Sequence, residues 1–150
     1  MREKILVCGG AGYIGSHMVR LLVAKGFDVV VLDDLSTGHR EAVQGVELVE
    51  ADIRDGAALD SVFESRDFDA VMHFCAKSLV GESVQQPLAY YDNNVAGSLS
   101  LLQAMQRHGV GKLVFSSTAA IFGEPVSEFI DETHPTAPVN PYGHSKLMVE

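Results

Sequence analysis

Residues 5–17 decide the fold, and they read Ile5-Leu6-Val7-Cys8-Gly9-Gly10-Ala11-Gly12-Tyr13-Ile14-Gly15-Ser16-His17. An apolar run leads into glycines, and the glycines lead into a helical pattern, which is the order of a dinucleotide-binding turn. Glycine there permits the tight bend, the approach of backbone to a pyrophosphate and the close packing of helix on strand. The helix that begins near Tyr13 then presents unpaired N–H groups and a positive dipole end to the phosphates.

A carboxylate at the end of the next predicted strand strengthens this interpretation. The strand covers residues 28–32 and is followed by Asp33 and Asp34, at the spacing expected for an acid that binds the adenosine ribose. Its charge would repel a 2′-phosphate, so the pattern favours NAD over NADP. Two alternatives stay open: the two acids end a strand in a solvated turn, or the nearby Arg40 allows NADP as well.

Composition indicates a soluble globular chain with enough apolar residues for one core. It has 150 residues, of which 47% are hydrophobic and 21% charged, and we expect one domain over residues 1–150. The net charge of −9 argues against nucleic acid and anionic membranes as partners. No signal peptide or membrane span is visible, so we expect a cytoplasmic protein. The six histidines lack ligand spacing, so no metal site is predicted.

Strand and helix signals alternate along the chain, which predicts a Rossmann-type doubly wound parallel sheet. Neighbouring strands in that sheet would bring Cys8 and Cys75 near the cofactor crevice, although two buried reduced thiols are the simpler interpretation. The further elements expected are strands over 46–50, 69–75 and 112–117, helices over 57–63, 87–109 and 142–150, and a loop over 123–141.

Tyr142 and Lys146 form the candidate catalytic pair. Four residues apart on a helix, they share one face about a turn apart. A phenol is a poor base at neutral pH, but a close cation favours its phenolate. Thr118, in the hydroxyl cluster at residues 116–118, could hydrogen-bond the same substrate oxygen; alternatively, these hydroxyls only cap a loop.

Six segments resemble the extended short-chain dehydrogenase/reductase family, and they follow the order of that family. They are residues 9–17, 33–38, 52–55, 73–84, 91–95 and 141–146. The resemblance implies Tyr142 as the catalytic base, with Lys146 as its pKa-lowering partner and as a ligand of the nicotinamide ribose. Thr118 takes the place of the catalytic Ser or Thr of the family.

The resemblance also implies a set of cofactor-binding residues. Glycines would hold the pyrophosphate, Asp33 the adenosine ribose, and Asp52 with Ile53 the adenine. The role of Lys77 is less defined, because some relatives carry the lysine one position later, where this chain has Ser78. The whole set is Gly9, Gly12, Tyr13, Ile14, Gly15, Asp33, Asp34, Ser36, Thr37, Asp52, Ile53, Phe74, Cys75, Ala76, Lys77, Asn94, Ser116, Tyr142 and Lys146.

The implied activity is NAD-dependent epimerisation at C4 of a UDP-hexose such as UDP-glucose or UDP-galactose, through a transient 4-keto sugar. A 4,6-dehydratase of the same family would usually carry an acid just after Thr118. Ala119 and Ala120 stand there, so the epimerase is favoured. A non-catalytic NAD-binding module is the other alternative, but such proteins tend to lose the Tyr and Lys.

The resemblance further implies that the carboxyl-terminal substrate lobe is absent from this chain. We therefore expect the chain alone to bind NAD and to turn over a UDP-sugar poorly. The family dimerises through helices that match residues 87–109 and the helix beginning at Pro141, which leaves a homodimer open.

Overall fold

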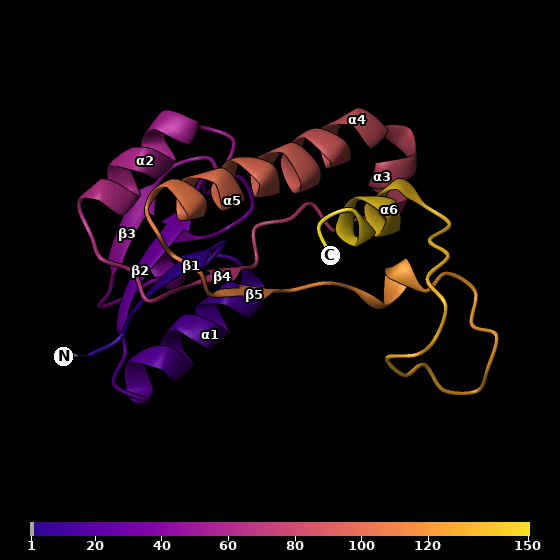
Figure 1. Ribbon diagram of the computed structural model, residues 1–150, viewed down its shortest axis with the longest axis horizontal. Helices are drawn as coiled ribbons and strands as arrows, with labels where there is room; N and C mark the ends of the chain where they lie inside the picture. The colour runs from indigo at the N-terminus through magenta and orange to yellow at the C-terminus, as the bar shows by residue number, and fades with distance from the viewer. Residues whose placement is uncertain (1) are drawn as a thin grey trace. The chain divides into compact units, whose positions relative to one another are not determined.

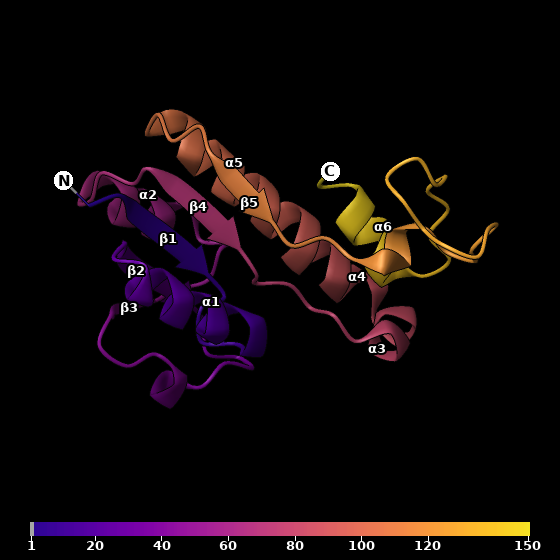
Figure 2. The same cartoon turned by 90° about the horizontal axis from the view of Figure 1, so that it is seen from below.

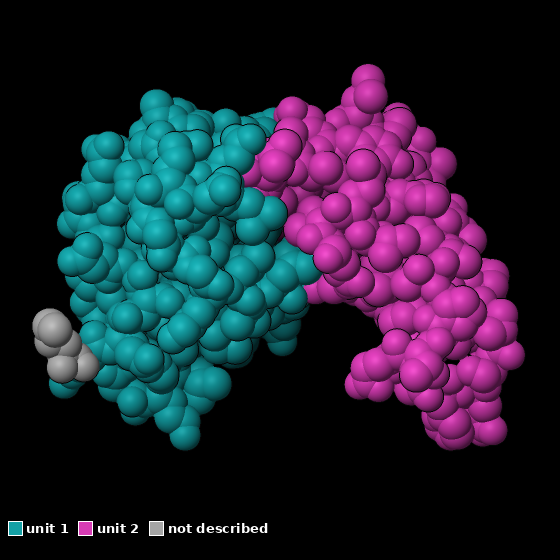
Figure 3. Space-filling view, in the orientation of Figure 1, with its two compact units in different colours: residues 1–75, 100–116 teal, residues 76–99, 117–150 magenta. Residues whose placement is uncertain are grey.

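The computed structural model describes residues 2–150, which form two compact units (Figure 3). Unit 1 comprises residues 1–75 and 100–116, and unit 2 comprises residues 76–99 and 117–150. The chain passes between the units at three places, so neither unit is one continuous stretch of sequence.

Five parallel strands form the sheet of unit 1 in the order β3-β2-β1-β4-β5 (Figure 1). The strands are β1 Lys4–Cys8, β2 Asp28–Asp33, β3 Glu47–Glu50, β4 Ala70–His73 and β5 Leu113–Phe115. The chain winds outward from β1 in both directions, which is the Rossmann order. The predicted fold class is confirmed, although β4 and β5 are shorter than the predicted strands.

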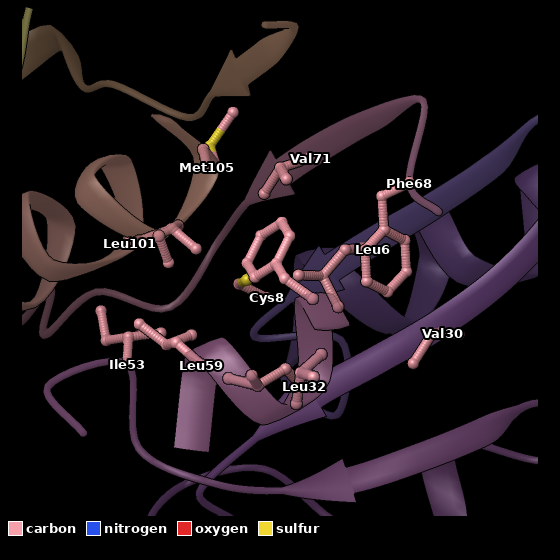
Figure 4. Close-up of a cluster of buried hydrophobic side chains, with 13 residues drawn as sticks. Leu6, Cys8, Val30, Leu32, Ile53, Leu59, Phe68, Val71, Leu101 and Met105 are labelled. Carbon is pink, nitrogen blue, oxygen red and sulfur yellow. The ribbon is translucent and has the colours of Figure 1, made fainter. Parts of the chain in front are cut away.

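Figure 2 shows the sheet and its helices from below. Apolar side chains cover both faces of the sheet. On one face, α1 (Tyr13–Ala24) packs Val19 and Leu22 against the β1 and β2 side chains. On the other face lie α2 (Gly56–Glu64) and the part of α5 (Gly97–Arg107) that belongs to unit 1. Figure 4 shows the second cluster, in which Leu6 and Val71 meet Leu101 and Met105. A short helical turn, η1 (Arg40–Ala42), follows β2.

Unit 2 consists of short helices around α6. These are α3 (Val80–Gln85), α4 (Pro87–Tyr90), η2 (Tyr91–Ala96), η3 (Ala119–Ile121) and α6 (Pro141–Leu147). The first four all contact α6. Residues 123–140 contain no helix or strand, as the prolines predicted. The helix beginning at Pro141 ends at Leu147 rather than continuing to Glu150, and α3 lies where the sequence predicted no helix or strand.

The predicted helix over 87–109 is three helical segments in succession, α4, η2 and α5, and η2 is π-helical. A π-helical turn admits an extra residue and redirects the side chains on it. Here Asn94 turns inward and is 1% exposed. The buried side of α5 carries Leu101 and Met105, whereas Leu99 and Leu102 are 55% and 38% exposed and lie outside that buried face.

Candidate active site

The glycine turn after β1 depends on glycine at two positions. Gly9 has a φ of +80°, which side chains rarely adopt, and a Cβ there would lie 2.6 Å from the backbone N of Cys75. A Cβ on Gly15 would lie 2.1 Å from the carbonyl oxygen of Gly9. Gly15 thus lets α1 pack directly on the turn, as the sequence predicted.

Gly12 has a different environment. Its φ is −78°, and a Cβ there would make only an ordinary 3.4 Å contact within the chain. Gly12 is the N-cap residue of α1. No side chain caps this helix, and no acidic residue lies in its first turn. The first backbone N–H groups of α1, including those of Tyr13 and Ile14, therefore have the arrangement that binds an anion. This open backbone fits the pyrophosphate of a dinucleotide.

Asp33 is held at the end of β2 by two backbone hydrogen bonds. Ala11 N–H donates to Oδ2 at 2.9 Å and Leu35 N–H donates to Oδ1 at 2.9 Å. The carboxylate is only 7% exposed, yet each oxygen keeps a second lone pair. The structure therefore joins Asp33 to the glycine turn through Ala11. The remaining acceptor capacity suits the two hydroxyls of a ribose.

Asp34, Ser36 and Arg40, which follow Asp33, already have hydrogen-bond partners within the chain. Asp34 accepts from both the backbone N–H and the hydroxyl of Ser36, at 2.9 and 2.7 Å, whereas Thr37 is exposed. Arg40, the residue that left NADP open, pairs with Glu50 at the end of β3. Because Glu50 already partners this guanidinium, the structure offers less support for a 2′-phosphate site there.

Asp52 and Ile53 follow β3. The Asp52 carboxylate accepts hydrogen bonds from the backbone N–H and from the guanidinium of Arg54. These hydrogen bonds lower the pKa of Asp52 below its ordinary value. Ile53 is 4% exposed and packs within the apolar cluster of Figure 4. The Ile53 side chain is thus a core residue, which leaves Asp52 and the local backbone as the groups able to meet an adenine.

The segment after β4 carries the next four predicted residues. Phe74 and Cys75 are half-buried in unit 1, and Phe74 N–H donates to the carbonyl of Cys8 at 2.8 Å. Ala76 and Lys77 belong to unit 2, where Ala76 is half-buried and the Lys77 side chain is exposed. The Cys8 and Cys75 thiols are both free and lie on neighbouring strands or just past them, as predicted.

In unit 2, α6 carries the predicted catalytic pair, Tyr142 and Lys146. Asn140 caps the helix by accepting from Gly143 N–H at 2.8 Å, and Pro141 occupies its first turn, as predicted. Tyr142 is half-buried, while Lys146 is 3% exposed. The helix therefore places the Tyr142 phenol one turn before the buried Lys146, the arrangement that proton transfer by Tyr142 would require.

Asn94 connects this helix to the Lys77 segment. Its side-chain amide accepts from Lys77 N–H at 2.9 Å and donates to the Lys77 carbonyl at 3.0 Å and to Ser145 Oγ at 2.9 Å. Asn93 donates to the Asn94 oxygen as well. With all four of its hydrogen-bond positions used, Asn94 positions the surrounding backbone rather than offering its amide to a ligand. Ser145 continues the chain by donating to the Tyr142 carbonyl at 2.7 Å.

Tyr90 was not singled out from the sequence, because nothing local distinguishes it from the adjacent Tyr91. Its side chain is fully buried, and its ring meets that of Tyr142 edge-on at 6.4 Å. The hydroxyl accepts from Leu79 N–H at 3.0 Å and lies 2.6 Å from Glu82 Oε2. Burial, with the Glu82 carboxylate beside it, raises the pKa of Tyr90 to about 12. Tyr90 thus joins α3 to Tyr142 as a neutral phenol.

The hydroxyl cluster after β5 is divided between the units. Ser116 belongs to unit 1, and its backbone N–H donates to the His73 carbonyl at 3.2 Å. Thr118 belongs to unit 2 and caps η3 by accepting from Ala120 N–H at 3.2 Å. That bond uses the oxygen as an acceptor, so the O–H remains able to donate. Ser117 Oγ is buried without a hydrogen-bond partner.

Residues 2–150 contain no candidate metal site and no helix suited to span a membrane. No group of three His, Cys, Asp or Glu side chains in this part of the chain could hold a metal ion. No described helix has the length and apolar character that crossing a membrane requires.

Known proteins resemble this chain over nearly its whole length. The family model described as GDP-mannose 4,6 dehydratase matches residues 6–150. The UDP-glucose 4-epimerase of Halalkalibacterium halodurans is 55% identical over 97% of this chain, but the match covers only 44% of that protein.

Solved structures of UDP-glucose 4-epimerases also resemble this chain. The Brucella ovis UDP-glucose 4-epimerase in complex with NAD has a TM-score of 0.96 and 46% identity, covering 98% of this chain and 45% of that one. The Bifidobacterium longum UDP-glucose 4-epimerase in complex with NAD+ and UDP has a TM-score of 0.93 and 40% identity, and the match covers 96% of this chain and 46% of that one. The chain thus spans less than half the length of these relatives. It belongs to the GDP-mannose 4,6 dehydratase family and is similar to the amino-terminal part of UDP-glucose 4-epimerases.

Proposed function

We propose that this chain is the NAD-binding and catalytic half of an enzyme that epimerises C4 of UDP-glucose and UDP-galactose. The observation that carries the proposal is the pair on α6, in which Tyr142 is half-buried and Lys146, one turn later, is buried. The glycine turn and Asp33 support a dinucleotide as the cofactor. The relatives solved with NAD, and with NAD+ and UDP, support this cofactor and a UDP-sugar substrate.

The residues of unit 1 would hold the cofactor. The uncapped start of α1 faces its phosphates, and the free lone pairs of Asp33 accept from its adenosine ribose. When bound, NAD supplies reversible acceptance of hydride from the C4 carbon of the sugar.

The residues of unit 2 would move the proton. Tyr142, as phenolate, takes the proton of the sugar's C4 hydroxyl and later returns it. The Lys146 ammonium stabilises the phenolate charge. Thr118 donates its O–H to the same sugar oxygen, which holds that oxygen in place during transfer. The proton and the hydride both return to the sugar, so the reaction leaves no net oxidation.

Two alternatives make different demands on the chain. Elimination of water by a 4,6-dehydratase needs a general acid near the bond that breaks, and the residues after Thr118 are Ala119 and Ala120. A non-catalytic NAD-binding module has no need of the phenol and ammonium on α6. The chain's residues therefore favour the epimerase over both.

A homodimer of the complete protein is also proposed. Leu88 of α4 is 81% exposed and Leu99 of α5 is 55% exposed, so the outer side of these helices carries apolar side chains in contact with water. Exposed apolar groups of this kind favour association with a second copy.

Two measurements test the proposed function. Native mass spectrometry of the chain with NAD is expected to show one bound cofactor per chain. For turnover, the chain is fused to the part of the Halalkalibacterium halodurans epimerase that lies beyond the matched region, and conversion of UDP-galactose to UDP-glucose is followed. The fusion is expected to be active, and its Tyr142→Phe variant inactive with NAD still bound. An active Tyr142→Phe variant, or a folded fusion that binds NAD without turnover, would contradict the proposal.

A further inference from the structure

Gly143 occupies a position where the backbone itself does not require glycine. It lies in the first turn of α6, between Tyr142 and Lys146, and it is buried. Its backbone is helical, without the positive φ found at Gly9. Because alanine forms helices better than glycine, local preference favours alanine at this position. The reason for glycine here lies in the packing of α6 against its neighbours.

The closest of these neighbours is η3, the short helical turn Ala119–Ile121. A Cβ on Gly143 would lie 2.5 Å from the carbonyl oxygen of Ala120 and 3.0 Å from the Cβ of Pro138. The Ala120 oxygen belongs to the backbone, so no rotation of a side chain can clear the first of these clashes. Gly143 thus lets α6 pack on η3 with no side chain between them.

The residue of η3 that meets Gly143 is also tied to Thr118. Ala120 N–H donates to Thr118 Oγ1 at 3.2 Å, and the carbonyl oxygen of the same Ala120 faces Gly143. On α6, Gly143 directly follows Tyr142. One residue of η3 therefore lies between Thr118 and the helix that carries Tyr142. The separation of α6 from η3 sets how far Thr118 lies from Tyr142.

We propose that Gly143 is a positioning residue, which holds Tyr142 and Thr118 at the separation that proton transfer requires by keeping α6 against η3. The inference rests on the proposed function, in which both hydroxyls meet the same sugar oxygen. Gly143 adds no chemical group to the reaction and acts through Tyr142. An alanine at this position would have to move from 2.5 Å to an ordinary contact of at least 3.4 Å from the Ala120 oxygen. A misplacement of about 1 Å can slow a reaction about 100-fold.

Turnover is measured in the fusion to the Halalkalibacterium halodurans epimerase, with NAD saturating. In Gly143→Ala we expect kcat for UDP-galactose to fall about 100-fold, while KM and the affinity for NAD change less than about fivefold. Gly81→Ala in α3 is the matched control, because a Cβ there meets no atom within 4 Å and activity should be unchanged. An undiminished kcat in Gly143→Ala would overturn the inference. A parent fusion that binds NAD without turnover would instead contradict the proposed function.

A double-mutant cycle separates positioning from a general loss of packing. In Thr118→Ala the sugar oxygen loses the Thr118 hydroxyl, so a displaced α6 has less left to disrupt. Gly143→Ala should therefore lower kcat by less than about tenfold in the Thr118→Ala background, against about 100-fold in the parent fusion. Equal falls in the two backgrounds would show that Gly143 does not act through the separation of Tyr142 from Thr118.

Crystal structures of the chain with and without Gly143→Ala test the geometric step in the absence of turnover. In the variant, α6 should lie further from the Ala120 oxygen of η3, since the new Cβ cannot stay within 2.5 Å of it. If the variant folds poorly, it is prepared with excess NAD, which stabilises the folded chain by mass action, and in the more helical Gly81→Ala background. An α6 that keeps its place, or a variant that stays unfolded under these conditions, would overturn the positioning role.

Discussion

The side-chain amide of Asn94 donates to the hydroxyl of Ser145 over 2.9 Å, although 51 positions separate the two residues in the chain. Ser145 in turn donates to the carbonyl of Tyr142. This relay joins the π-helical segment η2 to α6, the helix that carries Tyr142 and Lys146. The extra residue of the π-helical turn thus turns the Asn94 side chain inward, where its amide reaches Ser145.

Replacement of Asn94 should destabilise the chain strongly. Asn94→Ala leaves the part-buried backbone N–H and carbonyl of Lys77 and the buried Ser145 hydroxyl without Asn94 as their partner, at a cost of about 3 kcal/mol in the free energy of unfolding. Urea unfolding followed by circular dichroism measures the change. Asn93→Ala is the matched control, because Asn93 makes one bond to Asn94, and it should cost about 1 kcal/mol or less. Equal losses in the two variants would contradict the proposed relay.

Substitution in the glycine turn should separate cofactor binding from folding. In Gly15→Ala the new Cβ would meet the Gly9 carbonyl oxygen at 2.1 Å, so the start of α1 must move away from the turn. We expect the affinity for NAD to fall by at least about tenfold, measured by isothermal titration calorimetry. Gly56→Ala is the control, because a Cβ there meets only Ser100 Oγ, at 3.7 Å. Undiminished affinity in Gly15→Ala would mean that the cofactor does not use this turn.

The sequence predicted those parts of the fold that depend on short-range patterns. The glycine turn, Asp33 and the helix start at Pro141 each follow from a local rule of backbone geometry or capping, and the structure has all three. Helix α3 was missed because Gly81 and the β-branched Val80 disfavour a helix, so contacts with α4 and α6 must stabilise it.

Other features could not be predicted because they depend on residues far away in the chain. The π-helical turn at η2 depends on the bonds of Asn94 to Lys77 and Ser145, and no periodicity in residues 91–96 encodes those bonds. Ile53 illustrates the same limit in the candidate site. Its position after β3 predicts an adenine contact, but its side chain packs in the core, a distinction that only the packed structure makes.

The charge of Asp33 should contribute to the affinity for NAD. Asp33→Asn keeps the size of the side chain but replaces one acceptor oxygen with a donor and removes the charge. Hydrogen bonds to charged groups contribute about 1.5–3 kcal/mol, so NAD should bind about 10- to 100-fold more weakly. Asp28→Asn, an exposed change at the start of the same strand, is the control. The ratio of the NADP to the NAD affinity should rise in Asp33→Asn only; an unchanged ratio would remove Asp33 from the ribose site.

The raised pKa of Tyr90 predicts a loss of stability in alkali. Folding favours the neutral phenol, because its pKa is about 12 in the folded chain against 10.0 for an ordinary tyrosine. This contribution to stability is complete below pH 10 and is lost as the pH rises toward 12. Tyr90→Phe keeps the ring against Tyr142 but lacks the titrating group, so between these two pH values its free energy of unfolding should fall less than that of the unchanged chain.

Absorbance at about 295 nm provides a direct check on this assignment, since tyrosinate absorbs there and the chain has four tyrosines and no tryptophan. One phenol should titrate near pH 12 in the folded chain and be missing from Tyr90→Phe. Tyr91→Phe serves as the control, because the phenol that lies beside Glu82 is that of Tyr90, so the late titration should persist in this variant. A late phenol that survives in Tyr90→Phe would place the unionised tyrosine elsewhere and remove the link between α3 and the Tyr142 ring.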